Sequence, residues 1–153
     1  MNNEQNKINA RRIVEESWNK HNTKVLDELF ANDAPLHDPQ NPNGLKGPQG
    51  AKSTLETYLK AFPDLKITIE KEIADGEYVV QHLRATGTNT GELNGMPATG
   101  KKSSTIGVMT TKFDNGKVVE AWSIFDTFGL MQQLGVIPTE TTTKREPVFA
   151  GSR

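Results

Sequence analysis

The chain has 153 residues, with 18 basic and 19 acidic side chains, 3 His and no Cys, which suits one globular domain. A formal net charge of -1 provides no basic field to attract a phosphate backbone, so nucleic acid is not an expected partner. The lack of cysteine in the sequence excludes a disulfide framework, a thiolate nucleophile and a Cys-ligated zinc site.

The N-terminal region carries no recognisable targeting signal. Arg11 and Arg12 precede any apolar block, so the hydrophobic core of a secretory signal is missing. No stretch approaches the ~18 apolar residues that a membrane span requires. We therefore expect a cytoplasmic protein with no membrane partner.

The first third of the chain has the pattern of helices. Residues 7–20 carry apolar side chains at spacings near three to five, which is typical of an amphipathic helix. A second, short helix is predicted over residues 25–32. Residues 34–48 are rich in Pro, Gly and Asn and are expected to form a loop. A third helix should begin at Gly47-Pro48 and end at Pro63.

After Pro63 the apolar period changes from near 3.6 to 2, which indicates strands. Residues 65–70 and 78–86 should form one hairpin, and residues 102–113 and 117–125 a second, with a Gly-rich connection over 87–100. A short helix is expected over 127–134, followed by a tail over 139–153, so that residues 1–138 form a single domain. Helices followed by strands predict an α+β fold, in which helices cover a curved antiparallel sheet and enclose a cavity for a small molecule.

Several motifs stand in the order found in a known family: Phe62-Pro-Asp-Leu, Gly87-Thr-Asn-Thr-Gly, Gly95-Met-Pro-Ala-Thr-Gly-Lys, residues 113–126 and Gln132-Gln-Leu-Gly. Residues 8–138 resemble the SnoaL-like polyketide cyclases of the nuclear transport factor 2-like superfamily. The resemblance implies a cone-shaped α+β barrel. It also implies intramolecular aldol ring closure of an aromatic polyketide ester, with an aspartate as general acid/base and neither a metal nor an organic cofactor.

Asp126 matches the aspartate of the family. Side chains alternate along a strand, so Glu120, Trp122, Ile124 and Asp126 share one face, and we expect this face to line the cavity. The opposite face, with Val119, Ala121, Ser123 and Phe125, would then be free to pack against a second subunit of a homodimer or higher homo-oligomer. The alternative is that Asp126 only caps the helix that follows it.

The remaining candidate site residues are predicted less directly. His37 matches a histidine-containing segment of the family and is predicted as a second acid/base group, or else as an ordinary loop residue. His82, Asn89, Trp122, Phe62 and Ile124 are predicted to contact substrate; His82 could equally face solvent, and the aromatic residues could be core. The spacing of the three histidines predicts no metal site.

Three classes of function follow from these residues. The first is cofactor-free acid/base catalysis, by aldol-type cyclisation or isomerisation, on a small apolar carbonyl compound; an epoxide hydrolase would use the same aspartate. The second is a binding protein for an apolar or aromatic ligand, favoured because residues 102–113 lack the histidine that characterised cyclases carry on this strand. The third is an adaptor that dimerises through Val119, Ala121 and Phe125.

Overall fold

The structure is a computed structural model that describes residues 3–139 of the chain. The expected tail lies outside the described residues from position 140 onward. Helices occupy five segments, namely α1 (Asn3–Arg12), η1 (Ile13–Asn19), α2 (Lys24–Leu29), α3 (Gly47–Ala61) and α4 (Thr127–Gln133). Strands occupy six, namely β1 (Pro35–His37), β2 (Leu45–Lys46), β3 (Lys66–Asp75), β4 (Tyr78–Thr88), β5 (Lys102–Asp114) and β6 (Lys117–Phe125).

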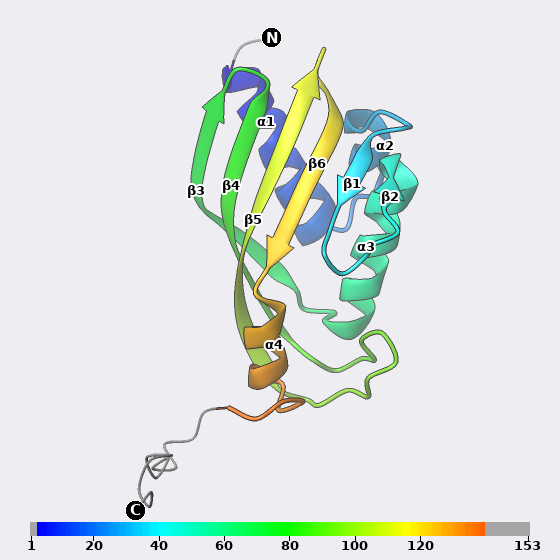
Figure 1. Cartoon of the computed structure of the whole chain (residues 1–153), viewed down its shortest axis with the longest axis vertical. Coiled ribbons are helices and arrows are strands. Elements are labelled where there is room, and N and C mark those ends of the chain that lie inside the picture. Colours follow the sequence, from blue (N-terminus) through cyan, green and yellow to red (C-terminus); the bar gives the residue numbers. More distant parts are fainter. Residues whose placement is uncertain (1–2, 140–153) are drawn as a thin grey trace, which may run out of the picture.

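The strands form one curved six-stranded sheet in the order β2-β1-β6-β5-β4-β3, and β2 and β3 are its two open edges (Figure 1). The two predicted hairpins are present, because β3 pairs with β4 and β5 with β6, each pair antiparallel. Only β1 and β6 run parallel within this sheet. The α+β fold with helices over a curved sheet is therefore confirmed, with a sheet that remains unclosed.

The segment predicted as a loop over residues 34–48 contains two short strands. Leu36 pairs with Leu45 across β1 and β2, and with Ala121 of β6 in parallel. Strands of two and three residues are too short to show a period, which is why the sequence pattern missed them. Pro35 is tolerated because it is the first residue of its strand. The addition of β1 next to β6 brings the turn after β1 to the edge of the cavity.

The predicted N-terminal helix changes its winding at Ile13, where α1 gives way to the π-helix η1. Within η1 the Ser17 hydroxyl donates a hydrogen bond to the carbonyl of Ile13. The side chain of Asn19 then fixes the end of η1 to β3 by two hydrogen bonds of 2.8 Å with the backbone of Ile67. Such wide turns are common at functional sites. Here the turn ends beside Trp18, which lines the pocket described below.

The main core lies between the helices and the concave face of the sheet. α1, η1 and α2 pack against this face, while α3 lies beside β1 and β2 (Figure 1). The fully buried apolar side chains of this core come from both layers and include Ala10, Ile13, Leu26, Leu55, Val79 and Val118. Ile13 and Leu26 of this core also line a pocket between the helices and the sheet.

Candidate functional site

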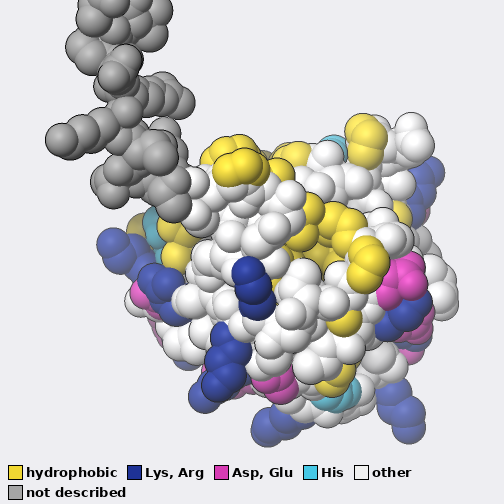
Figure 2. Space-filling view, turned by 90° about the horizontal axis from the view of Figure 1, so that it is seen from below, with side chains coloured by type: hydrophobic (Ala, Val, Ile, Leu, Met, Phe, Trp, Pro, Cys, Tyr) yellow, Lys and Arg dark blue, Asp and Glu magenta, His cyan; other side chains and the backbone are white. Residues whose placement is uncertain are grey.

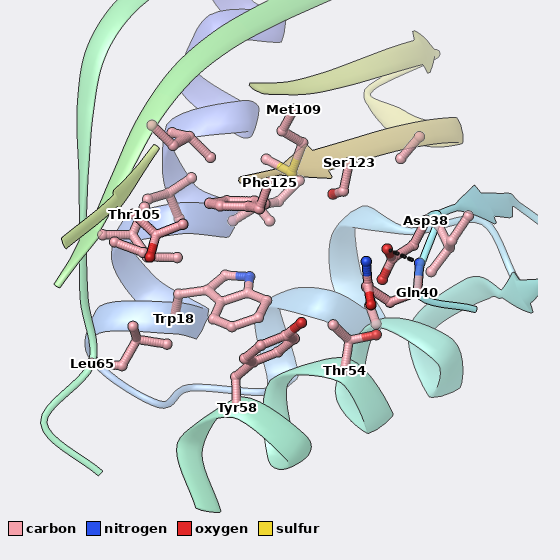
Figure 3. Close-up of a pocket in the computed structure, with 18 of the residues that line it drawn as sticks. Trp18, Asp38, Gln40, Thr54, Tyr58, Leu65, Thr105, Met109, Ser123 and Phe125 are labelled. Carbon is pink, nitrogen blue, oxygen red and sulfur yellow. Dashed lines mark hydrogen bonds between the residues drawn. The ribbon is translucent and has the colours of Figure 1, made fainter. Parts of the chain in front are cut away.

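A mainly apolar pocket lies between the helices and the inner face of the sheet. Its apolar walls come from every layer of the fold and include Val14, Leu26, Phe62, Leu65, Leu83, Met109, Phe125 and Leu130. Figure 2 views the molecule from the α4 end and shows hydrophobic side chains gathered within a hollow on this end. Polar side chains are fewer, and they include Asp38, Gln40, Thr54, Tyr58, Thr105 and Ser123 (Figure 3). An apolar cavity with a few convergent polar groups is the usual form of a small-molecule site.

The inner face of β6 is the opposite of the one expected from the sequence. Ala121, Ser123 and Phe125 line the pocket, whereas the Ile124 side chain is 63% exposed on the outer face. The pairing of β5 with β6 explains this difference in direction. The register shifts after Lys112, which leaves Val119 unpaired as a β-bulge. Val118 is buried, and the extra residue after it places Ala121, instead of Glu120 and Trp122, on the inner face. The alternation was predicted correctly, but the assignment of the Glu120, Trp122, Ile124 and Asp126 face to the cavity was wrong.

The same finding corrects the predicted adaptor surface. Ala121 is 7% exposed and packs in the core, and the ring of Phe125 lies over Gly107 on the inner face. A Cβ atom added to Gly107 would meet this ring at 2.4 Å, so a glycine at this position is what lets Phe125 lie flat against β5. Neither residue is available to contact another subunit.

Asp38 enters the pocket from the turn after β1. Leu36 points to the inner face with its partner Ala121, His37 points outward with Trp122, and alternation brings Asp38 back to the inner side. Asp38 Oδ1 accepts a hydrogen bond of 2.9 Å from the backbone N–H of Gln40. Its Oδ2 accepts one of 3.0 Å from the Asn41 side chain. These bonds fix the carboxylate in place at the rim of the cavity.

Gln40 closes the rim between this turn and the last helix. Its side-chain amide donates a hydrogen bond of 3.2 Å to the hydroxyl of Thr127, the first residue of α4. Both residues line the pocket. The turn that carries Asp38 is thereby attached to the segment that follows β6.

Tyr58 and Trp18 form the wall opposite the inner sheet face, with ring centroids 6.4 Å apart. Figure 3 shows both rings reaching into the pocket, Tyr58 from α3 and Trp18 from η1. Burial raises the pKa of the Tyr58 hydroxyl above its ordinary value, and the negative charge of Asp38 raises this pKa further. Tyr58 therefore stays protonated at neutral pH and can donate a hydrogen bond into the pocket.

His37 contributes to the pocket wall, but its ring is directed to the outer face. Its Nε2 lies 2.7 Å from Glu120 Oε2, and the ring stacks on Trp122 at a centroid distance of 5.4 Å. Trp122 lies in turn against Tyr78, also on the outer face. The structure therefore brings His37 and Trp122 together, on the side of the sheet away from the cavity.

Asp126 caps α4. Its Oδ1 accepts a hydrogen bond of 2.9 Å from the backbone N–H of Gly129, and its side chain is exposed. Asp126 is not among the described residues that line the pocket. This is the capping geometry that the sequence left open as the alternative to catalysis.

Three other residues predicted to contact substrate differ in location: one lines the pocket, one is buried outside the lining, and one is exposed on the outer face of the sheet. Phe62 lines the pocket and is 3% exposed. Asn89 is buried outside the lining, where its side chain holds the connection between β4 and β5 through Gly91 and Thr99. His82 lies on the outer face of β4 and is exposed. Within residues 3–139, no group of three or more His, Asp or Glu side chains is placed to hold a metal ion.

Sequence reasoning missed Asp38 and Tyr58. Asp38 was assigned to a loop, although the segment Leu36-His37-Asp38 has the two-residue alternation of a strand end. Tyr58 stands in the apolar stripe with Leu55 and Phe62, which is equally typical of core packing. The phenol hydroxyl within that stripe was the one available signal of a polar function.

A fold of this type, with a pocket between the helices and the concave sheet face, is shared with a known family. The family model described as SnoaL-like polyketide cyclase matches residues 8–134. The chain belongs to the SnoaL-like polyketide cyclase family. Among curated proteins, no match to the chain was found. No helix within residues 3–139 has the length and apolar character needed to cross a membrane.

Solved structures with the same fold come from several bacteria. AclR from Streptomyces galilaeus, a proposed hydroxylase, is 26% identical with a TM-score of 0.80, over 92% of this chain and 87% of AclR. IdmH from Streptomyces antibioticus, a proposed polyketide cyclase, is 27% identical with a TM-score of 0.74, over 86% and 99% of the two chains. A proposed polyketide cyclase from Acidithiobacillus ferrooxidans is 30% identical with a TM-score of 0.74, over 86% and 95%. The family match and the two proposed cyclases support a cyclase- or isomerase-type role.

Proposed function

We propose that the protein catalyses aldol-type cyclisation or isomerisation of a small apolar carbonyl compound, such as a polyketide-like ester, by acid/base chemistry without a cofactor. The observation that carries this proposal is an apolar pocket with an ionisable carboxylate and a protonated phenol at its wall. Proton transfer at a carbon next to a carbonyl needs one group to take the proton and one to hold the carbonyl oxygen.

The size of the pocket supports a small substrate. The cavity is about 160 Å³, and apolar cavities of roughly 150 Å³ bind a molecule such as benzene. One ring of a substrate can therefore sit inside while the rest extends toward the mouth near Gln40. The apolar walls would hold a hydrophobic ring, and the few polar groups would orient its oxygen atoms.

A non-catalytic binding protein is the second candidate. It is favoured by the position of Asp126, whose carboxylate caps α4, and of His82, which faces outward. The assignment of Asp126 as the base, with His37 or His82 as its helper, stays a prediction made from the family resemblance.

Hydrogen–deuterium exchange in heavy water separates the two candidates. The protein is incubated with a panel of β-dicarbonyl compounds and polyketide-like esters, and NMR follows the proton on the activated carbon. Exchange above the buffer rate supports acid/base catalysis, and Asp126→Asn in parallel tests that residue as the base. A panel that binds, shown by ligand-observed NMR, but does not exchange would favour the binding protein.

A homodimer or higher homo-oligomer is also proposed, now through the outer sheet face. Ile106 on β5 and Ile124 on β6 are 53% and 63% exposed on this face, and Phe128 on α4 is 68% exposed. Exposed apolar side chains on one face are typical of an interface. Sedimentation analysis should give a dimer for the wild type and a monomer for Ile124→Lys, with Thr86→Lys on the same face of β4 as the matched control. A wild-type monomer would contradict this proposal.

A cytoplasmic location stays a prediction, which cell fractionation tests.

A further inference from the structure

The described residues that line the pocket include one carboxylate, that of Asp38, and no lysine or arginine. The hydrogen bonds from Gln40 and Asn41 use one lone pair on each oxygen of this carboxylate. Each oxygen therefore keeps a second lone pair for another contact. The carboxylate is held in a defined orientation, faces the cavity, and has no cationic side chain among the described lining residues to neutralise it.

Tyr58 supplies a donor near this carboxylate. Within residues 3–139 its hydroxyl forms no hydrogen bond with a protein group, and Figure 3 shows it pointing into the pocket. The negative charge of Asp38 reaches this hydroxyl, since it contributes to the raised pKa of Tyr58. An acceptor group and a donor group are thus placed within electrostatic reach of each other, around a space that a ligand can enter.

We propose that Asp38 is the general base of this site and that the Tyr58 hydroxyl holds the substrate carbonyl oxygen, so that the site selects neutral carbonyl compounds over carboxylic acids. This assignment rests on the acid/base function proposed above. The selection follows from charge, because an anionic substrate would meet the Asp38 carboxylate in an apolar pocket without a compensating cation.

The step balances without any further reactant. Asp38 takes a proton from the carbon between two carbonyl groups, and the electron pair of the broken C–H bond moves onto the carbonyl oxygen that Tyr58 hydrogen-bonds. The enolate carbon then forms a C–C bond to a second carbonyl carbon of the same molecule. The oxygen of that second carbonyl receives the proton back from Asp38, which returns to its starting state.

Asp126 provides the matched comparison for this assignment. Both aspartates follow the last residue of a strand, but Asp38 lines the pocket and Asp126 bonds to Gly129 on the surface of α4. Asparagine has one acceptor oxygen, which keeps the Gly129 bond at position 126 and one of the two bonds at position 38. It is also a good helix cap, so Asp38→Asn and Asp126→Asn should both fold. Circular dichroism and thermal unfolding verify this before activity is compared.

The first arm measures exchange at the activated carbon with wild type and these two variants. Asp38→Asn should lower the exchange rate by at least 100-fold, since general base catalysis contributes about that much or more. Asp126 is the rival candidate for the base, from the family resemblance, so the two assignments predict opposite outcomes. If Asp38 is the base, Asp126→Asn should stay within threefold of the wild type. Loss of exchange in Asp126→Asn with retention in Asp38→Asn would overturn the assignment while leaving the proposed function intact.

The second arm does not depend on turnover. It titrates 4-nitrophenolate, an aromatic anion that resembles an enolate, into each protein and follows its absorbance. Asp38→Asn should bind the anion at least tenfold more tightly than the wild type, because a negative charge has been removed. Tyr58→Phe should bind it at least tenfold more weakly, and Asp126→Asn should match the wild type.

The two arms separate the failure of the function from the failure of the assignment. If no substrate of the panel exchanges with the wild type, the proposed function fails, but the nitrophenolate titration still decides whether Asp38 and Tyr58 face one bound anion. Equal affinities of the wild type, Asp38→Asn and Tyr58→Phe would overturn the pair. Tighter binding of the anion by Asp38→Asn and weaker binding by Tyr58→Phe would support these two residues as the polar end of the site.

Discussion

The inner and outer faces of β5 and β6 both carry apolar side chains, yet they differ in exposure. The inner face combines the small residues Ala121 and Ser123 with the larger Met109 and Phe125, and all four line the cavity. The outer face leaves large apolar side chains, including Ile106 and Ile124, more than half exposed. Hydrophobicity alone therefore does not identify the face that lines a pocket. Small side chains leave the space that a ligand can occupy, and helices over that face enclose it.

The largest expected effect comes from removing a side chain of the inner face. Leu83 on β4 is 3% exposed, whereas Ile73 on the outer side of β3 is 55% exposed. Leu83→Ala should lower the free energy of unfolding by about 2–5 kcal/mol, because it leaves a cavity. Ile73→Ala should change it by less than about 0.5 kcal/mol. Urea denaturation measures both. Similar losses would show that the outer face is as buried in solution as the inner one.

The next effect concerns ligand binding rather than stability. Ser123 faces the pocket and Ile124, the next residue, faces away. Ser123→Phe should weaken binding of a neutral aromatic ketone such as acetylnaphthalene by at least tenfold, or about 1.4 kcal/mol, since the added ring occupies the ligand space. Ile124→Phe should leave the affinity within twofold. Fluorescence titration measures both, and equal affinities for the two variants would place the ligand outside this pocket.

More of the fold than of the site could be predicted from the sequence, because a sequence pattern reports local structure and not tertiary packing. Long amphipathic helices and hairpins such as the one at Asn115-Gly116 have strong local patterns, so α3 and the β5–β6 hairpin were predicted close to their bounds. A period of two separates the faces of β6 but does not state which face is covered. That choice depends on the helices packed against the sheet and on the bulge at Val119, which are features of the tertiary structure.

The side-chain directions at the turn after β1 could not be predicted from the sequence either. Three residues of β1 give no periodic signal, so His37 was singled out for its titratable ring and Asp38 was not. In the structure the pairing with β6 turns His37 outward to Glu120 and Asp38 inward. Family resemblance pointed to Asp126 because it compares positions, and position alone does not give the direction of a side chain.

Asp126 allows the role of its carboxylate in the fold to be measured separately. Asp126→Ala removes the acceptor of the Gly129 N–H bond and should lower the free energy of unfolding by about 1 kcal/mol, within a range of 0.5–2 kcal/mol. Asp126→Asn keeps an acceptor and should stay within about 0.5 kcal/mol of the wild type. Urea denaturation decides between the two. Equal losses in both variants would mean that the charge, and not the cap, stabilises this end of α4.

The smallest expected effect lies where the inner face of β4 ends. Asp64 accepts hydrogen bonds of 2.7 Å and 2.8 Å from the backbone N–H and the hydroxyl of Thr88, next to Gly87, which lines the pocket. These bonds lower the pKa of Asp64 below its ordinary value. A carboxyl with a lower pKa in the folded state binds its proton less readily there than in the unfolded state. Its stabilising effect is therefore full above the unfolded pKa of about 3.9 and is lost as the pH falls through the folded value.

Because Asp64 is exposed, solvent screens these interactions and the effect on the melting temperature should be small, about 1–3 °C for a domain of this size. Asp64→Asn should lower the melting temperature by that amount at pH 7, and the difference should shrink toward pH 2 as the carboxyl of the wild type takes up its proton. Differential scanning calorimetry at the two pH values measures the difference. An equal deficit at both pH values would show that the carboxylate charge contributes nothing and that only the shape of the side chain holds Thr88 at the end of β4.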